Sequence, residues 1–188
     1  MLRIKRAVDR KLDKYKARLV AKGFTQKEGV NYTETFATTL RFEFLRALIA
    51  YAASEGLYLE QVDVSTLFLY ADIDEKNYME IPEGMEGYGS GKVMLLHKSI
   101  YGLKQASRLW NQHLDKVLGE LEYHRLTSDF GVYIKGKGEN KVLMGVYVDD
   151  IIMLAKVMQI LNELKGHLQL EFKMKDLGAA NFIVGMKI

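Results

Sequence analysis

A pair of adjacent aspartates, Asp149 and Asp150, constrains this chain most, because it interrupts two strongly apolar segments. Residues 142–148 precede the pair and residues 151–155 follow it, which predicts two β-strands joined by a tight turn. Burying two neighbouring carboxylates is strongly disfavoured, since each loses hydration and each repels the other. The pair therefore lies in a solvated turn or binds a cation. Aspartate is a common turn former, so the residues alone leave both alternatives open.

The composition is that of a globular protein. With 188 residues and 48% hydrophobic content, the chain can bury the core of one domain or of two closely packed subdomains. No segment approaches the ~20 apolar residues of a membrane span, and the first residues lack the apolar core of a secretory signal. The absence of cysteine excludes disulfides and cysteine-based metal sites. We therefore expect an intracellular protein, cytoplasmic or nuclear, that is neither secreted nor associated with a membrane.

Positive charge is concentrated at the N-terminal end. Residues 1–27 hold ten Lys or Arg against two Asp, a balance of +8, so the remaining residues carry −5 of the overall +3. Such asymmetry indicates either a surface for a polyanion, most commonly nucleic acid, or an ordinary solvated charged face. The alternation over residues 16–24 predicts a strand of a basic hairpin with its positive charges on one side.

Hydrophobic periodicity predicts an α+β fold, a mainly antiparallel sheet backed by helices. Apolar residues at helical spacing indicate helices over residues 42–55, 110–121 and 157–168. Shorter apolar or alternating runs indicate strands near residues 57–64, 93–97, 131–135, 142–155 and 182–188.

A third carboxylate, Asp63, lies near the end of the predicted strand 57–64. If that strand lies beside the Asp149–Asp150 hairpin, three carboxylates meet without histidine or cysteine, a set of ligands that Mg²⁺ or Mn²⁺ prefers. Mg²⁺ usually takes only one or two protein carboxylates and completes its shell with water and substrate phosphates, which implies a phosphate-bearing substrate. Two such ions ~3.5–4 Å apart would activate an attacking hydroxyl and stabilise the leaving oxygen, as in polymerases and nucleases.

Six motifs follow one another along nearly the whole chain. They are YKARLVAKGFTQ at 15–26, QVDV at 61–64, YMEIPEG at 78–84, LHKSIYGLKQA at 96–106, YVDD at 147–150 and MKDLG at 174–178. In this order and spacing they resemble the reverse transcriptase domain of copia-type long-terminal-repeat retrotransposon polyproteins. The resemblance implies a right-hand polymerase with fingers roughly at 1–38 and 74–105, a palm roughly at 39–73 and 106–188, and no thumb within the sequence.

The resemblance also implies roles for the three aspartates. Asp63 and Asp149 would bridge two Mg²⁺ ions, with Mn²⁺ as a possible substitute, and Asp150 would assist less directly. The primer 3′-hydroxyl would attack the α-phosphate of a dNTP, and pyrophosphate would leave. The implied partners are an RNA template, a DNA primer and dNTP, together with the thumb, ribonuclease H and integrase regions of a longer polyprotein, which this sequence lacks.

Further residues receive roles from the same resemblance. Those expected to bind or position the nucleotide are Lys16, Arg18, Lys22, Phe68 and Gln105, where Phe68 is either the steric gate against a ribose 2′-hydroxyl or a core aromatic. Those expected to bind nucleic acid are Lys5, Arg6, Arg10, Lys11 and Lys14, so the resemblance favours the nucleic-acid interpretation of the basic segment.

Two functions are therefore considered. The first is a reverse transcriptase core that performs nucleotidyl transfer with two metal ions. The alternative is a catalytically inactive retrotransposon remnant that at most binds nucleic acid through residues 1–27.

Overall fold

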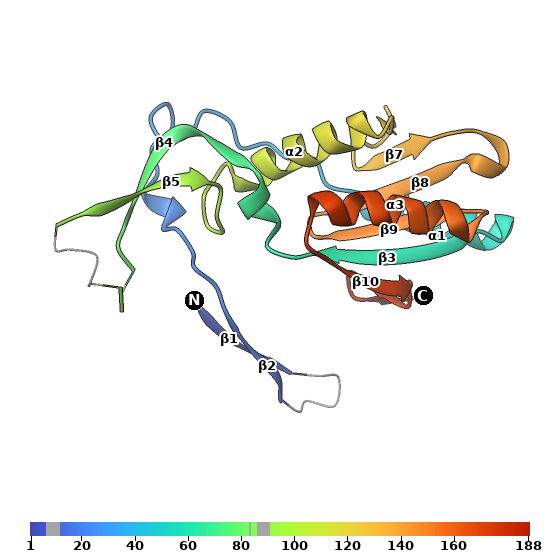
Figure 1. The fold of residues 1–188 in the computed structure, drawn as a ribbon, viewed down its shortest axis with the longest axis horizontal. Helices are drawn as coiled ribbons and strands as arrows, with labels where there is room; N and C mark the ends of the chain where they lie inside the picture. Colours follow the sequence, from blue (N-terminus) through green and yellow to red (C-terminus); the bar gives the residue numbers. More distant parts are fainter. Residues whose placement is uncertain (7–11, 83, 86–90) are drawn as a thin grey trace. The chain divides into compact units, whose positions relative to one another are not determined.

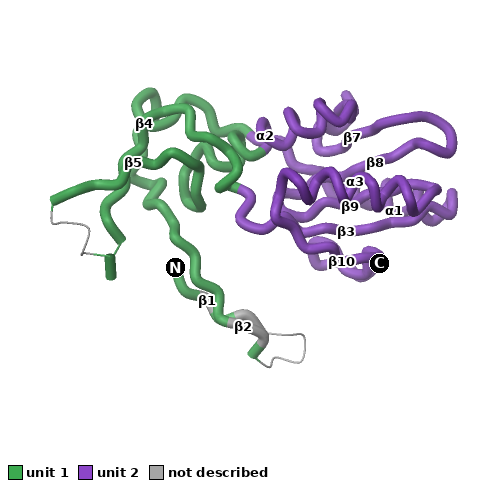
Figure 2. The backbone as a smooth tube through the Cα atoms, viewed as in Figure 1, with its two compact units in different colours: residues 1–36, 68–110 green, residues 37–67, 111–188 purple. Residues whose placement is uncertain are grey.

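A computed structural model describes residues 1–6, 12–82, 84–85 and 91–188 of the chain. The backbone divides into two compact units, which Figure 2 shows in different colours. Unit 1 comprises residues 1–36 and 68–110, and unit 2 comprises residues 37–67 and 111–188. Each unit is described by itself below.

Unit 2 is built on a six-stranded sheet in the order β10-β3-β9-β8-β7-β6, in which every neighbouring pair is antiparallel. The strands are β3 (Tyr58–Val64), β6 (His124–Arg125), β7 (Val132–Lys135), β8 (Val142–Tyr147), β9 (Asp150–Ala155) and β10 (Met174–Ala179). Nearly all of β8 and β9 is buried, because helices cover both faces of the sheet (Figure 1). The predicted antiparallel sheet backed by helices is confirmed.

Three α-helices occur in the described part of the chain: α1 (Phe42–Glu55), α2 (Ala106–Glu120) and α3 (Met158–Glu171). The bounds predicted for α1 are confirmed, and its buried residues Leu45, Leu48 and Ala52 follow the expected helical spacing. α1 ends at Gly56, whose φ of 62° is the left-handed conformation that glycine adopts without a Cβ clash. No described helix is both long and apolar enough to cross a membrane.

One face of the unit 2 sheet packs against α1. Leu45 and Leu48 of α1 join Leu40, Ile152 and Leu154 in a buried cluster. The segment before α1 also lies close to the sheet, since the Leu40 backbone N–H donates to the Val146 carbonyl at 2.9 Å. A Cβ at Gly131 would lie 2.4 Å from the Leu40 nitrogen, so only glycine permits this approach.

The other face carries a buried ion cluster. Lys165 of α3 is 5% exposed, and its Nζ lies 2.6 Å from Glu60 Oε2 on β3 and 2.8 Å from Asp176 Oδ1 on β10. Burial alone would lower the pKa of Lys165, but hydrogen bonds and charge from Asp176 and Glu60 raise it overall. The aspartate of the MKDLG motif therefore anchors the outermost strand β10 to α3.

Unit 1 contains two hairpins. β1 (Leu2–Arg6) pairs with β2 (Leu12–Ala17), and β4 (Asp72–Glu80) pairs with β5 (Val93–Lys98). Unit 1 also contains the short 3₁₀ helix η1 (Gly23–Thr25), and unit 2 contains η4 (Gly138–Asn140). A further 3₁₀ helix, η2 (Leu67–Tyr70), begins at the last residue of the first segment of unit 2 and continues into unit 1.

Several predicted elements differ from the structure. The strand predicted over residues 16–24 is wrong, because β2 ends at Ala17 and the Ala21 N–H donates instead to the Tyr101 carbonyl at 2.8 Å. Residues 182–188 form two short paired strands, β11 (Phe182–Ile183) and β12 (Met186–Lys187), instead of one strand. β4 and β10 were not predicted.

Candidate active site

The three aspartates gather at one end of the unit 2 sheet. In the register of β3 and β9, Asp63 lies directly opposite Asp150, and side chains at such paired positions point to the same face. Tyr147 pairs with Asp150 across β8 and β9, so Val148 and Asp149 form a two-residue turn. The Val64 N–H donates to the Asp149 carbonyl at 2.9 Å, which ties this turn to the end of β3. The predicted proximity of Asp63 to the hairpin is confirmed.

The turn has an unusual backbone conformation at Val148. Its φ of 57° is left-handed, a conformation that costs a residue with a Cβ roughly 1–2 kcal/mol and that is rarest for β-branched side chains. Two-residue hairpin turns with positive φ at the first position normally use glycine there. Such strain persists only where the surroundings impose it, and it is concentrated at functional sites. Here the pairing of β8 with β9 and the bond to Val64 hold the turn that carries Asp149.

The carboxylates affect one another electrostatically. Burial is the main reason why the pKa of Asp150 is raised above its ordinary value, and the charges of Asp149 and Asp63 raise it further. A hydrogen bond opposes this shift, since Gln61 Nε2 donates to Asp150 Oδ1 at 3.0 Å. A bound cation would relieve the repulsion among the three carboxylates.

The donor atoms suit a hard divalent cation. All three side chains offer oxygen, the ligand that Mg²⁺ and Mn²⁺ prefer. Within the described ranges, no group of three or more His, Asp or Glu side chains lies together in a way that could hold a metal ion. Mg²⁺ does not require such a group, because water and substrate phosphates normally complete its shell. The aspartates therefore fit the ion in ligand chemistry, with a phosphate substrate as the remaining ligand.

Comparison with known proteins identifies the family. The family model described as "Reverse transcriptase (RNA-dependent DNA polymerase)" matches residues 3–188. The chain belongs to this reverse transcriptase family. The chain is 43% identical over its whole length to the retrovirus-related Pol polyprotein from transposon TNT 1-94 of Nicotiana tabacum, and it covers 14% of that protein.

Two further relatives come from other hosts. Over 95% of the chain, identity is 32% to the retrovirus-related Pol polyprotein from transposon RE1 of Arabidopsis thaliana, of which the chain covers 12%. Over 76% of the chain, identity is 31% to the truncated transposon Ty1-A Gag-Pol polyprotein of Saccharomyces cerevisiae, of which the chain covers 12%. The predicted resemblance to copia-type retrotransposon polyproteins is confirmed, and the reverse transcriptase chain spans about an eighth of these relatives.

In unit 1 of the reverse transcriptase chain, one tyrosine links two of the predicted nucleotide-binding residues. The Arg18 guanidinium lies 4.8 Å from the centroid of the Tyr101 ring, and that ring meets Phe68 edge-on with centroids 4.7 Å apart. Phe68 is buried, with 8% of its surface exposed. No role was predicted for Tyr101, although the residue lies within the LHKSIYGLKQA motif.

Gln105 belongs to a buried network of amides. Its side chain is fully buried, its Nε2 donates to the Asn31 carbonyl at 2.8 Å, and its Oε1 accepts from Gln26 Nε2 at 3.0 Å. Gln26 Nε2 also donates to Asn77 Oδ1 at 2.9 Å, which brings β4 into the network. Contact between Gln105 and a nucleotide stays a prediction, and in this conformation Gln105 holds the segments around it together.

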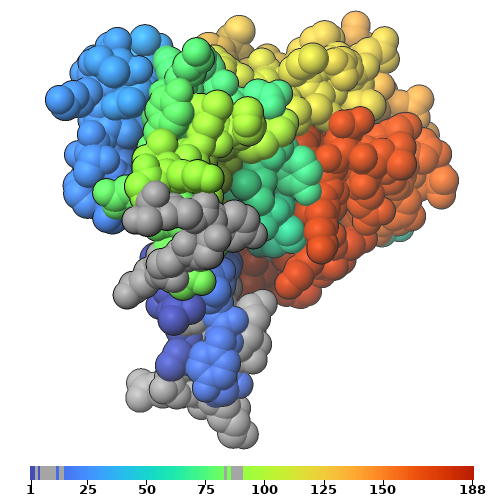
Figure 3. Space-filling model, turned by 60° about the vertical axis from the view of Figure 1, so that its left-hand side comes forward, coloured from blue at the N-terminus to red at the C-terminus, as the bar shows by residue number. Residues whose placement is uncertain are grey.

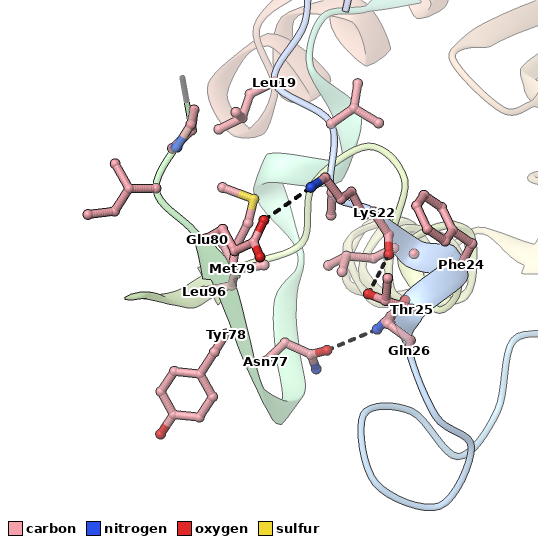
Figure 4. A pocket seen from close by; sticks show the side chains of 16 residues that line it. Leu19, Lys22, Phe24, Thr25, Gln26, Asn77, Tyr78, Met79, Glu80 and Leu96 are labelled. Carbon is pink, nitrogen blue, oxygen red and sulfur yellow. Dashed lines mark hydrogen bonds and ion pairs between the residues drawn. The ribbon is translucent and has the colours of Figure 1, made fainter. Parts of the chain in front are cut away.

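Lys22 lies at a cleft of about 870 Å³ in unit 1 (Figure 4). Lys22 Nζ is 3.0 Å from Glu80 Oε2, and both side chains are largely exposed, so the pair contributes roughly 0–1 kcal/mol at most. The cleft has both polar and apolar walls and lies between residues 19–26 and strand β4. Figure 3 shows these blue and green segments side by side. Labelled lining residues in Figure 4 include Leu19, Phe24, Tyr78, Met79 and Leu96.

The other basic residues are on the β1–β2 hairpin. In the backbone register of this hairpin, Lys5 pairs with Lys14 and Arg3 pairs with Lys16. Arg6 pairs with Leu12. The predicted nucleic-acid ligands Arg10 and Lys11 lie outside the described residues.

Proposed function

We propose that this chain is the core of an RNA- and DNA-templated DNA polymerase, which transfers nucleotides from dNTP to the 3′-hydroxyl of a DNA primer. The observation that carries the proposal is the pairing of Asp63 with Asp150 beside the strained turn that holds Asp149. In this proposal unit 2 is the palm and unit 1 contributes the fingers.

Each aspartate has a part in the proposed reaction. Asp63 and Asp149 would hold two Mg²⁺ or Mn²⁺ ions, and Asp150 would assist less directly because Gln61 already engages one of its oxygens. When bound, the two ions would lower the pKa of the primer hydroxyl and stabilise charge on the leaving oxygen. The primer 3′-oxygen then forms a bond to the α-phosphorus, the α–β phosphoanhydride bond breaks, and pyrophosphate leaves.

Unit 1 would bind the nucleotide and the nucleic acid. Lys16, Arg18 and Lys22 would face the triphosphate or template, where arginine can bind phosphate through two hydrogen bonds. Phe68, oriented by its contact with Tyr101, would act as the gate against a ribose 2′-hydroxyl. The basic hairpin residues Lys5, Arg6, Arg10, Lys11 and Lys14 would contact phosphates without regard to base sequence.

We further propose that the domain acts within a longer polyprotein, together with thumb, ribonuclease H and integrase regions. The printed names of its relatives, which are Pol and Gag-Pol polyproteins, support this proposal. An intracellular site of action, in cytoplasm or nucleus, would bring the domain to its RNA template, and a chain without cysteine suits that reducing environment.

Primer extension tests the proposed function. The 188-residue chain is incubated with an RNA template, an annealed DNA primer, dNTP and Mg²⁺, and extension is compared with that of Asp149→Asn. We expect Asp149→Asn to abolish extension without changing the unfolding midpoint, and the exposed Asp72→Asn to serve as a control with wild-type extension. Extension that survives in Asp149→Asn would refute the catalytic assignment. Salt-sensitive nucleic-acid binding without any extension by the wild-type chain would identify the inactive remnant instead.

A further inference from the structure

A buried glutamine reaches the aspartate cluster from strand β3. Gln61 lies two residues before Asp63, so both side chains point to the same face of the sheet. Only 4% of Gln61 is exposed, and its Nε2 donates to Asp150 Oδ1 at 3.0 Å. Among the described residues, this amide is the hydrogen-bond partner of the Asp150 side chain.

The chemistry of the amide suits an orienting role. A lysine or arginine at position 61 would neutralise the carboxylate and compete with a metal ion for it. An aliphatic side chain would leave Oδ1 without a partner and the carboxylate free to rotate. A neutral amide restrains one oxygen of Asp150 and preserves the negative charge of the cluster. Glutamine also spans the diagonal between the two strands, because Gln61 pairs with Ile152 and not with Asp150 itself.

We propose that Gln61 is a positioning residue that fixes the Asp150 carboxylate and thereby sets how tightly the three-aspartate site binds divalent cations. This inference rests on the proposed function, since it assigns the cluster to metal binding. Hydrogen-bond partners that orient metal-binding carboxylates typically contribute 10–100-fold to metal affinity or activity. Gln61 therefore acts through Asp150 and does not itself touch the substrate.

Mn²⁺ titration calorimetry on the 188-residue chain tests the inference. Gln61→Met keeps the length of the side chain and removes the donor, and we expect it to weaken Mn²⁺ binding by about tenfold. Asp150→Asn keeps an acceptor for Gln61 and removes the charge. Because Gln61 acts through Asp150, the double variant should bind Mn²⁺ no more weakly than Asp150→Asn alone.

The matched control is Gln159→Met. Gln159 Nε2 donates to Glu163 Oε1 at 3.1 Å on α3, which makes it another glutamine bonded to a carboxylate. Gln159 follows the end of β9 that is remote from Asp150. We therefore expect Gln159→Met to bind Mn²⁺ with the affinity of the wild-type chain. In primer extension, Gln61→Met should lower kcat with little change in the KM for dNTP, and excess Mn²⁺ should restore much of the rate. A purely structural role would not produce this restoration.

The outcomes separate the inference from the proposed function. Absence of Mn²⁺ binding by the wild-type chain refutes the proposed metal site and the inference with it. If the wild-type chain binds Mn²⁺ and Gln61→Met binds it with an affinity within twofold of the wild type, the inference alone is refuted. The same holds if the double variant binds Mn²⁺ more weakly than Asp150→Asn. If the variants do not fold, an NMR titration of the wild-type chain with Mg²⁺ still tests the inference. The Gln61 side-chain amide signal should shift, and the midpoint of its shift should equal that of the Asp150 backbone amide. A Gln61 signal that does not shift would overturn the proposal.

Discussion

Removal of the Lys165 charge is the perturbation whose cost the structure defines most clearly. Lys165→Met keeps the apolar stem and removes the ammonium group that lies 2.6 Å from Glu60 and 2.8 Å from Asp176. Only 9% of the Glu60 side chain is exposed, so its carboxylate loses its buried partner, whereas 43% of the Asp176 side chain is exposed and water can hydrate it. Removing one partner of a buried pair typically costs about 3–5 kcal/mol, and we expect Lys165→Met to fall in this range.

The double variant Glu60→Gln with Lys165→Met separates charge from packing. Without the buried charge on Glu60, we expect the double variant to recover at least about 2 kcal/mol relative to Lys165→Met. Urea denaturation followed by circular dichroism measures both free energies of unfolding. A cost below about 1 kcal/mol for Lys165→Met, or no recovery in the double variant, would refute the view that this cluster anchors β10 to the sheet.

The same cluster sets a pH dependence of stability. The pKa of Lys165 is raised from 10.5, so its contribution is complete below pH 10.5 and is lost as the pH rises through the folded-state pKa. Burial alone would raise the pKa of Asp176, but the Lys165 and Gly178 hydrogen bonds lower it below 3.8 overall. Its contribution is therefore present above pH 3.8 and is lost as the pH falls through the lowered pKa. In Lys165→Met the Lys165 dependence should disappear, whereas the Asp176 dependence should only weaken, because the Gly178 hydrogen bond remains.

Two further predictions concern the amide network and the aspartate site. Gln105→Leu removes a fully buried amide that bonds to Asn31 and Gln26, and it should destabilise unit 1 by about 1–3 kcal/mol. Hydrogen exchange of residues 26–31 measures this loss of stability. The control is Gln159→Leu, a change at an exposed residue that should leave the exchange unchanged. Burial and the neighbouring carboxylates raise the pKa of Asp150 above 3.8, so the affinity for Mn²⁺ should decline while the pH is still above 3.8. Calorimetry that shows a constant affinity down to pH 3.8 would contradict this electrostatic explanation.

Strand pairing at the aspartates could be predicted from the sequence. Apolar runs on both sides of Asp149–Asp150 predict a hairpin, and the motif order suggests that Asp63 lies beside it. The register shows this placement directly. The conformation of Val148 could not be predicted, because valine favours extended backbone and only the surrounding pairing imposes a φ of 57°.

Long-range partners explain the other differences. The alternation of residues 16–24 resembles a strand, yet the backbone around Ala21 bonds to Tyr101, a residue eighty positions away. β10 is largely exposed and has no buried alternation that would predict a strand. Its Asp176 bonds to Lys165, which shares the buried face of α3 with Leu161, Leu164 and Leu168 although lysine is rarely buried. Gln61 was part of a recognised motif, but its bond to Asp150 depends on the register between β3 and β9.

Paramagnetic broadening by Mn²⁺ tests the central claim most directly, because it locates the metal without requiring turnover. The measurement adds substoichiometric Mn²⁺ to the isotope-labelled chain and follows the backbone amide signals by NMR. We predict that the signals of Asp63, Asp149 and Asp150 broaden first, and that Asp149→Asn greatly reduces the effect. Broadening that begins at other carboxylates, such as Asp74 and Glu75 of β4, would contradict the assignment of the three aspartates as the metal site.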